Sequence, residues 1–275
     1  MGEIETRRED IRKLEGVHVF HFPMSNCSQR VRMTATEKGI AWTSHIVDLT
    51  RDEHHTPGYL ALNPKGLVPV LVHDGRTFIE SNDIIAYLDD AFPDPPLMPE
   101  AAADRDFVRQ AIESANGAQG AIKLLSHEFL FKPKALKSPK ALEAFAAQCQ
   151  DKALLDFHRE FTAGKGFSAE RIRAALQDIN ARFEVLEQRL GARPWLSGET
   201  YGLADISWIV NAHRLDLMAF PFAPYPRLKT WLKQAKARAS FAAGIRAFEA
   251  GSLRVLFATY TQYRHLRRTA AKHYL

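Results

Sequence analysis

Three neighbouring side chains near the start of the chain have the types that chemistry requires. Ser25, Asn26 and Cys27 bring a hydroxyl, an amide and a thiol into one short segment. A hydroxyl or an amide can donate a hydrogen bond to an anion, and a cysteine thiolate is itself a nucleophile. The segment therefore indicates either stabilisation of an anionic reactant or thiol chemistry at Cys27.

The elements that must position these side chains are a strand and a helix. Residues 17–22 are β-branched and aromatic, Pro23 ends the run, and cap-type residues open a helical segment that stops at Gly39. The free N–H groups at a helix start form a site for an anion. Ser and Asn at such a place also serve simply as helix caps. The turn alone leaves both roles open.

Further motifs follow in order. Residues 28–32 read SQRVR, residues 63–71 read NPKGLVPVL, and Glu80-Ser81 opens a helix over residues 82–90. With Ser25 upstream, this series resembles the glutathione transferase superfamily. The resemblance implies an α+β protein in which a thioredoxin-like domain of βαβ-ββα order precedes an all-α helical bundle. We expect a leader at 1–15, a thioredoxin-like domain at 16–91, a proline-rich linker at 92–99 and an all-α domain at 100–275.

Hydrophobic periodicity predicts the helices of the second domain. They cover residues 107–125, 139–161, 169–190, 204–218, 226–248 and 253–266. Gly202 and Asp205 match a capping box in which the carboxylate bonds to the N–H of the cap residue. We expect the leader to be mobile or loosely helical, and the basic tail from Arg264 onward to be solvated.

The resemblance assigns the ends of glutathione to particular residues. Residues 53–60 are similar to the E-H-K-x-P segment of plant phi-class transferases, so His54 and His55 are expected at the glycine carboxylate. The strand that starts near Val68 and Pro69 is expected to have a cis bond between them, with the Val68 main chain pairing with the cysteinyl unit. Leu67 stands where many members have Lys or Gln, which weakens the polar grip on glutathione.

The γ-glutamyl end of glutathione carries both an ammonium and a carboxylate. Ser81 and its helix N-terminus suit the carboxylate, while Glu80 suits the ammonium. The co-substrate that the resemblance implies is glutathione. No metal is expected, because the two cysteines, Cys27 and Cys149, have no metal-ligand spacing.

The predicted mechanism is activation of the glutathione thiol. Ser25 is expected to donate a hydrogen bond to the thiolate, with Asn26 in support. The alternative nucleophile is Cys27 itself, since a cysteine at a helix N-terminus can have a lowered pKa and form mixed disulfides. Residues 25–28 also resemble the S-S-C-S motif of zeta-like members, where a cysteine accompanies a catalytic serine. An inert, buried Cys27 is a further possibility.

The second domain is expected to supply the apolar half of the site, which suits a hydrophobic or aromatic electrophile. Five aromatic residues either roof that pocket or belong to the core: Phe129, Phe131, Phe157, Phe161 and Phe167. Residues 157–206 are similar to bacterial β-aryl etherases of lignin breakdown, so glutathione-dependent ether cleavage is an alternative reaction. A protein that binds glutathione without catalysis is another alternative.

Composition agrees with a folded, soluble chain. Of 275 residues, 46% are apolar and 25% charged, and 37 basic against 32 acidic residues make a mixed surface rather than a nucleic-acid footprint. The sequence contains no apolar run of membrane-spanning length. We expect a cytoplasmic protein that binds neither nucleic acid nor membrane. The resemblance implies a twofold homodimer in which the first domain of one subunit packs against the helical domain of the other.

Overall fold

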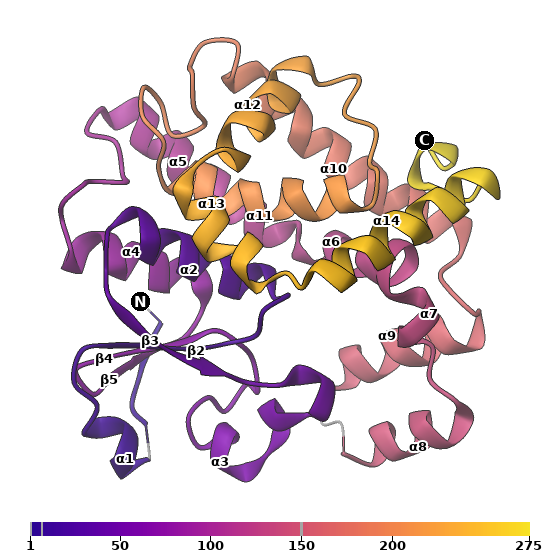
Figure 1. The fold of residues 1–275 in the computed structure, drawn as a ribbon, viewed down its shortest axis with the longest axis horizontal. Coiled ribbons are helices and arrows are strands. Elements are labelled where there is room, and N and C mark those ends of the chain that lie inside the picture. The colour runs from indigo at the N-terminus through magenta and orange to yellow at the C-terminus, as the bar shows by residue number, and fades with distance from the viewer. Residues whose placement is uncertain (1, 7, 149–150) are drawn as a thin grey trace.

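A mixed β-sheet is followed along the chain by a set of helices (Figure 1). The computed structural model describes residues 2–6, 8–148 and 151–275, and of residues 133, 134 and 148 only the backbone. The sheet has the strand order β1-β5-β4-β2-β3. Its strands are β1 (Glu3–Ile4), β2 (Val17–His21), β3 (Trp42–Ile46), β4 (Val70–His73) and β5 (Arg76–Phe78).

Strand directions follow the predicted βαβ-ββα order. The parallel pair β2 and β3 is joined through α2 (Asn26–Glu37), and β4 runs antiparallel to β2 and pairs with β5. A parallel pair needs such a crossover connection, whereas β4 and β5 need only a short turn. The remaining helices of this part are α1 (Glu9–Arg12), α3 (Pro57–Leu60) and α4 (Ser81–Ala91), with 3-10 turns η1 (Leu49–Arg51) and η2 (Glu53–His55).

The leader was expected to be mobile or loosely helical, and the structure gives it one helical turn, α1, and a short strand, β1. Residues Glu3 and Ile4 form β1, which pairs antiparallel with β5. Ile11 in α1 is buried beneath the sheet, and Arg76 forms an ion pair with Glu3 at 2.8 Å. A two-residue strand and a one-turn helix are too short to show a periodic pattern, so these elements were missed.

Both faces of the sheet are apolar, because successive apolar residues of a strand point to opposite faces. In β4, Leu71 belongs to the large core cluster, while Val70 and Val72 belong to a smaller cluster with Ile11 and Tyr59. Successive strand residues point to opposite faces, which accounts for the division. Helices α2 and α4 lie on the face toward the helical domain, with α1 and α3 across the sheet (Figure 1). The large cluster continues into the helical domain, so one core joins both parts.

The second part is all helical, as predicted. Its elements are α5 (Ala102–Gly117), α6 (Gln119–Ser126), the π-helical turn η3 (His127–Phe131), α7 (Lys132–Ala135), α8 (Pro139–Gln148), α9 (Lys152–Ala163), α10 (Ala169–Arg189), α11 (Leu203–Leu217), α12 (Pro226–Lys236), α13 (Ala239–Gly244), the 3-10 turn η4 (Arg246–Phe248), α14 (Gly251–Leu266) and the 3-10 turn η5 (Ala271–His273). No helix within the described ranges is long and apolar enough to cross a membrane.

Three predicted long helices are each divided. Residues 107–125 form α5 and α6, residues 139–161 form α8 and α9, and residues 226–248 form α12, α13 and η4. Asp151 caps α9 by accepting a hydrogen bond from the Leu154 N–H, and Arg238 before α13 has extended backbone. Periodicity alone predicted one continuous helix across each of these breaks.

The predicted capping box at the start of α11 is confirmed. The Asp205 carboxylate accepts from the Gly202 N–H at 3.1 Å and also from the Trp231 indole at 2.7 Å. Burial raises its pKa despite these bonds. The basic tail is largely exposed, as expected, at Arg267, Arg268, Lys272 and His273. Arg264 is the exception, because it is buried and forms an ion pair with Glu128 at 3.0 Å.

Candidate functional site

Strand pairing brings the predicted site residues to one edge of the sheet. Phe20 pairs with Val70, and Leu71 pairs with Phe78. The segments just beyond these pairs are the turn before α2, the Val68-Pro69 step and the start of α4. The loop with His54 and His55 follows β3, which is parallel to β2 and therefore ends at the same edge.

Ser25 is the N-cap of α2. Its Oγ accepts a hydrogen bond from the Ser28 N–H at 3.2 Å, and its backbone is extended, as a cap requires. No residue in the described ranges accepts a hydrogen bond from this hydroxyl. The capping contact therefore uses the Ser25 oxygen as an acceptor. The hydroxyl can still donate a hydrogen bond to a ligand at the positive end of the helix dipole.

A cavity of about 360 Å³ opens at Ser25, between the two domains. The first domain lines it with Phe22, Met24, Ser25, Asn26 and Leu49, and the helical domain with Gln119, Ile122, Lys123, Ser126, His127, Phe131 and Arg214. The volume lies in the range of small-molecule sites. Of the five aromatic residues considered from the sequence, Phe131 lines this cavity, and Phe129, Phe161 and Phe167 are buried in the core. The fifth, Phe157, is partly buried against the same core.

Asn26 lies beside Ser25, but its side chain belongs to a cluster of three side-chain amides, with those of Asn211 and Gln119. Its Nδ2 donates to the Asn211 Oδ1 at 3.2 Å, and the Gln119 Nε2 donates to the same oxygen at 2.9 Å. The Asn26 Oδ1 is buried and has no partner among the described residues. Asn26 thus links the turn to the helical domain, and its support of a thiolate stays a prediction.

Two buried arginines hold the turn that precedes Ser25. Arg32 donates to the carbonyls of Phe22 and Pro23, at 3.3 and 2.9 Å. Arg214 on α11 donates to the carbonyl of Met24 at 2.5 Å. Burial lowers the pKa of Arg32 to about 9 and that of Arg214 to about 10, so both remain charged at neutral pH. Three consecutive carbonyls before Ser25 are therefore fixed by positive side chains.

Cys27 follows Ser25 and Asn26 on the first turn of α2. It is a half-buried free cysteine, and it is not among the residues that line the cavity. Cys149 lies outside the described residues. The cavity thus presents the hydroxyl of Ser25 rather than the thiol of Cys27.

His54 and His55 lie together in η2, with ring centroids 3.8 Å apart. Burial, with His55 close by, holds the pKa of His54 below its usual value, so His54 is neutral at pH 7. Gly66 approaches both residues closely: a Cβ there would lie 3.1 Å from the His54 carbonyl oxygen. Asp52, His54 and His55 have ligand atoms within 4.8 Å of one another, which makes them one group in the described ranges that could hold a metal.

The peptide bond between Val68 and Pro69 is cis, as predicted. Leu67 is exposed, and its carbonyl accepts from the Tyr59 hydroxyl and from the Asn63 amide, both at 2.7 Å. These two bonds fix the segment just before the cis bond.

Ser81 is the first residue of α4, and Glu80 before it has a positive φ of 65°. The Arg30 guanidinium donates to the Ser81 Oγ at 3.0 Å, so the Ser81 proton stays available. Glu80 accepts from the Lys65 ammonium at 2.6 Å on the surface. The sequence placed these residues together, but the contacts of Arg30 and Lys65 with them were not anticipated.

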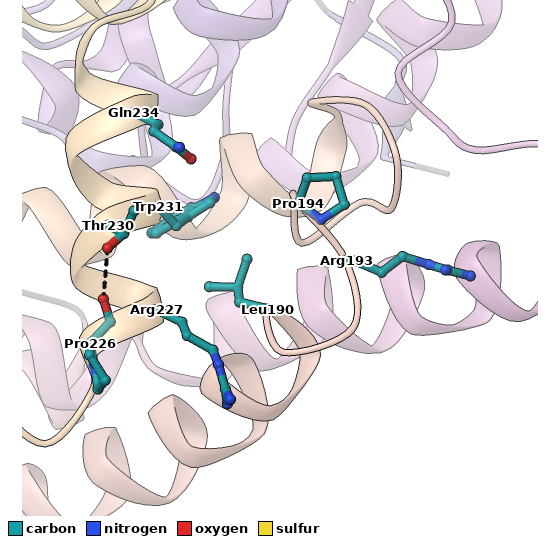
Figure 2. Close-up of a pocket in the computed structure, with 8 residues that line it drawn as sticks. All are labelled: Leu190, Arg193, Pro194, Pro226, Arg227, Thr230, Trp231 and Gln234. Atoms are coloured by element: carbon teal, nitrogen blue, oxygen red, sulfur yellow. Dashed lines mark hydrogen bonds between the residues drawn. The ribbon is translucent and has the colours of Figure 1, made fainter.

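Residues of the helical domain are the part of the site that the sequence analysis missed. Asn211, Gln119 and Arg214 carry no local motif, and Asn211 lies 185 residues from its partner Asn26. A second hollow lies between the end of α10 and α12, where Arg193, Pro194, Arg227 and Trp231 surround it (Figure 2). None of the described residues of α2 or of the sheet lines this hollow. The cavity at Ser25 is therefore the better candidate site.

Comparison with known proteins identifies the family. The family models "Glutathione S-transferase, N-terminal domain" and "Glutathione S-transferase, C-terminal domain" match residues 19–96 and 169–234. Glutathione S-transferase 1 of Dianthus caryophyllus is 32% identical over 213 residues, covering 74% of this chain and 82% of that protein.

Maleylacetoacetate isomerase of Pseudomonas aeruginosa is 27% identical, covering 81% and 92% of the two chains. The crystal structure of β-etherase LigF from Sphingobium sp. strain SYK-6 shares the fold, with a TM-score of 0.74, 24% identity and coverage of 83% and 98%. The chain belongs to the glutathione S-transferase family.

Proposed function

We propose that this protein is a glutathione transferase in which Ser25 activates the glutathione thiol for attack on a hydrophobic, aromatic electrophile. The observation that carries the proposal is the position of Ser25 at the wall of the interdomain cavity. Its hydroxyl oxygen accepts the hydrogen bond that caps α2, so the hydroxyl can still donate one. A thiolate placed there would accept a hydrogen bond from the Ser25 hydroxyl and face the helix N-terminus.

The required stabilisation is modest. A free thiol has a pKa of about 8.5, and lowering it by two units needs about 2.7 kcal/mol of preference for the thiolate. A hydrogen bond to a charged group contributes about 1.5–3 kcal/mol, and a helix N-terminus adds about 0.3–1 kcal/mol. The guanidinium groups of Arg32 and Arg214 act in the same direction. Ser25 and its surroundings therefore suffice without a further base.

Glutathione would lie along the sheet edge with its γ-glutamyl carboxylate at Ser81 and its cysteinyl main chain against Val68. Its glycine carboxylate would meet His54 and His55, where a neutral His54 offers an N–H rather than a charge. Glu80 would bind the ammonium by exchanging its surface contact with Lys65. Because reduced glutathione is the co-substrate, we place the protein in the cytoplasm.

We also propose a homodimer that uses α5 and α10. A groove of about 310 Å³ between these helices is lined largely by apolar side chains, among them Phe107 and the exposed Val185. The first domain of a second copy would cover this surface of the helical domain, and twofold symmetry would make the contact reciprocal. Light scattering at working concentration should give about twice the chain mass of 31.0 kDa, and a monomer would contradict this part.

The test combines binding with turnover. Titration calorimetry with reduced glutathione and a screen of aryl halides and aryl ethers should be run on the wild type, Ser25→Ala and Cys27→Ser. We expect Ser25→Ala to bind glutathione but to lose turnover. If Cys27→Ser abolishes activity instead, the protein is a Cys27-dependent thiol transferase. If the wild type has no affinity for glutathione, the proposal is wrong.

A further inference from the structure

Arg214 is a buried cation, and some of its N–H groups donate to no other described residue. It is 5% exposed, lies on α11 and lines the cavity beside Ser25. A guanidinium has five N–H donors in a planar fork, and the contact recorded for Arg214 is the one from Nη2 to the Met24 carbonyl. In the described ranges, Nε and Nη1 donate to no residue, and no carboxylate forms an ion pair with this side chain.

Glu249 is the acidic residue whose charge acts on the pKa of Arg214. That carboxylate is bonded to the His213 ring through Oε1 at 2.8 Å, and it does not line the cavity. Glu249 favours the charged form of Arg214 from a distance, against the effect of burial. A buried charge without a close partner is costly, so a ligand anion at Arg214 would relieve that cost.

The lining of the cavity has one sign of charge. Arg214 and Lys123 are its cations at neutral pH, because burial lowers the pKa of His127 to about 4. The described residues that line it include no Asp or Glu. Phe22, Ile122 and Phe131 give it apolar walls, and the Arg214 Cζ lies 5.6 Å from the centre of the Phe131 ring. Apolar walls with a cation at one side fit an aromatic ring that bears an acid group.

We propose that the electrophile is an aromatic carboxylate, whose acid group pairs with Arg214 while its reactive carbon faces the thiolate at Ser25. This inference rests on the proposed transferase function. The planar fork of a guanidinium matches the two oxygens of a carboxylate. Arg214 thus selects the substrate and, through the Met24 carbonyl, also positions the turn that carries Ser25.

A matched pair of substrates tests the acid group. With 4-chloro-3,5-dinitrobenzoate, the glutathione sulfur forms a bond to the ring carbon that carries chlorine, the carbon–chlorine bond breaks, and chloride leaves while the thiol proton passes to solvent. The methyl ester of the same acid reacts identically but is neutral. Each kcat/KM is divided by the uncatalysed rate with glutathione, because the ester activates the ring more strongly.

For the wild type we expect the corrected kcat/KM to favour the acid over the ester by about 10- to 100-fold, the range of a hydrogen bond to a charged group. In Arg214→Gln this preference should fall to about one. Arg214→Lys, which keeps the charge but loses the fork, should retain part of it. Any disturbance of the turn changes both substrates together and leaves their ratio intact.

Two control variants locate the effect. Arg227→Gln removes an exposed arginine at the hollow in Figure 2 and should leave the ratio unchanged. Lys123→Gln tests the other cation of the cavity. A loss of preference in Lys123→Gln but not in Arg214→Gln would overturn the assignment to Arg214.

The outcomes separate this inference from the proposed function. If the wild type turns over the ester as well as the acid, the carboxylate site is wrong but the transferase stands. If Arg214→Gln weakens glutathione binding in calorimetry and slows both substrates equally, Arg214 serves glutathione and the inference is again wrong. If neither substrate reacts and glutathione does not bind, the proposed function itself fails.

Discussion

Arg214 of the helical domain holds the carbonyl of Met24, the residue immediately before Ser25, at 2.5 Å. The side chain that fixes the turn thus comes from the second domain, whereas the hydroxyl that it positions belongs to the first. Arg32 completes the arrangement through the carbonyls of Phe22 and Pro23. The geometry at Ser25 therefore depends on the docking of the two domains.

His21 should make the protein less stable in acid. Its Nδ1 accepts from the Arg32 guanidinium at 3.0 Å, and its Nε2 proton is donated to the Ser44 Oγ at 2.8 Å. Burial and Arg32 lower its pKa from 6.5 to about 3. Between these values the unfolded chain binds a proton that the folded chain does not, so stability is full above pH 6.5 and falls as the pH drops toward 3.

Urea unfolding at several pH values checks this. In the wild type, the proton that His21 binds on unfolding should contribute up to about 1.4 kcal/mol per pH unit to the slope of the unfolding free energy between pH 6 and 4. His21→Gln removes this contribution, so its slope should be smaller. Ser44→Ala keeps the contact with Arg32 and should keep the wild-type slope. Equal slopes in His21→Gln and the wild type would contradict the prediction.

Lys38 should be a strong determinant of stability. Its ammonium is buried, bonds to the Asp89 carboxylate at 2.6 Å and donates to the Pro95 carbonyl at 2.6 Å. The same carboxylate accepts from the N–H groups of Leu97 and Met98, so this pair fixes the linker between the domains. Lys38→Met leaves a buried carboxylate without its cation and should cost about 3–5 kcal/mol.

The control is the exposed pair of Arg109 and Asp106, at 3.3 Å on the surface of α5. Arg109→Met should change the free energy of unfolding by no more than about 1 kcal/mol. Denaturant titrations of both variants measure the difference. A small effect for Lys38→Met would mean that the buried pair does not secure the linker.

Gly244 should tolerate no side chain. It ends α13 against α2, where a Cβ would lie 2.9 Å from the Met33 Cγ and 3.0 Å from the Met33 nitrogen, and its carbonyl accepts from the Arg32 Nε at 2.7 Å. Gly244→Ala should therefore push α13 away from α2 and cost about 1–3 kcal/mol. Gly120→Ala, in open space, serves as the comparison in thermal unfolding. Equal melting temperatures would refute the close approach.

Cys27→Ala should leave transferase activity within a factor of about three. The thiol is half-buried and does not line the cavity, and alanine suits the first turn of a helix. Steady-state kinetics with glutathione and an aryl halide measures this, with mixed-disulfide formation followed by mass spectrometry. Loss of activity with loss of the disulfide would identify Cys27 as the nucleophile.

Local signals predicted several elements of both domains. The strand, turn and helix around Ser25, the Val68-Pro69 step and the capping box at Asp205 each depend on neighbouring residues, so their patterns are visible in the sequence. β1 and α1 were missed because each spans at most four residues. The helix breaks near residue 118 and at Arg238 were missed because apolar periodicity continues across them.

On the substrate side of the site, the sequence indicated Phe131 but not the polar residues of the helical domain. Arg214 meets Met24 across 190 residues, and Gln119 meets Asn211 across 92, through contacts that exist only after the domains dock. Nothing near Arg214 in the sequence distinguishes it from the other arginines. Its burial, its unused donors and its place in the cavity wall identify it.

The pKa of the glutathione thiol bound to the protein tests the central claim most directly. The ultraviolet absorbance of the thiolate should be titrated with pH in the wild type and in Ser25→Ala, at saturating glutathione. We predict a pKa about two units below that of free glutathione in the wild type, with at least one unit of that shift lost in Ser25→Ala. An equally low pKa in both proteins would contradict the assignment of Ser25 as the hydrogen-bond donor to the thiolate.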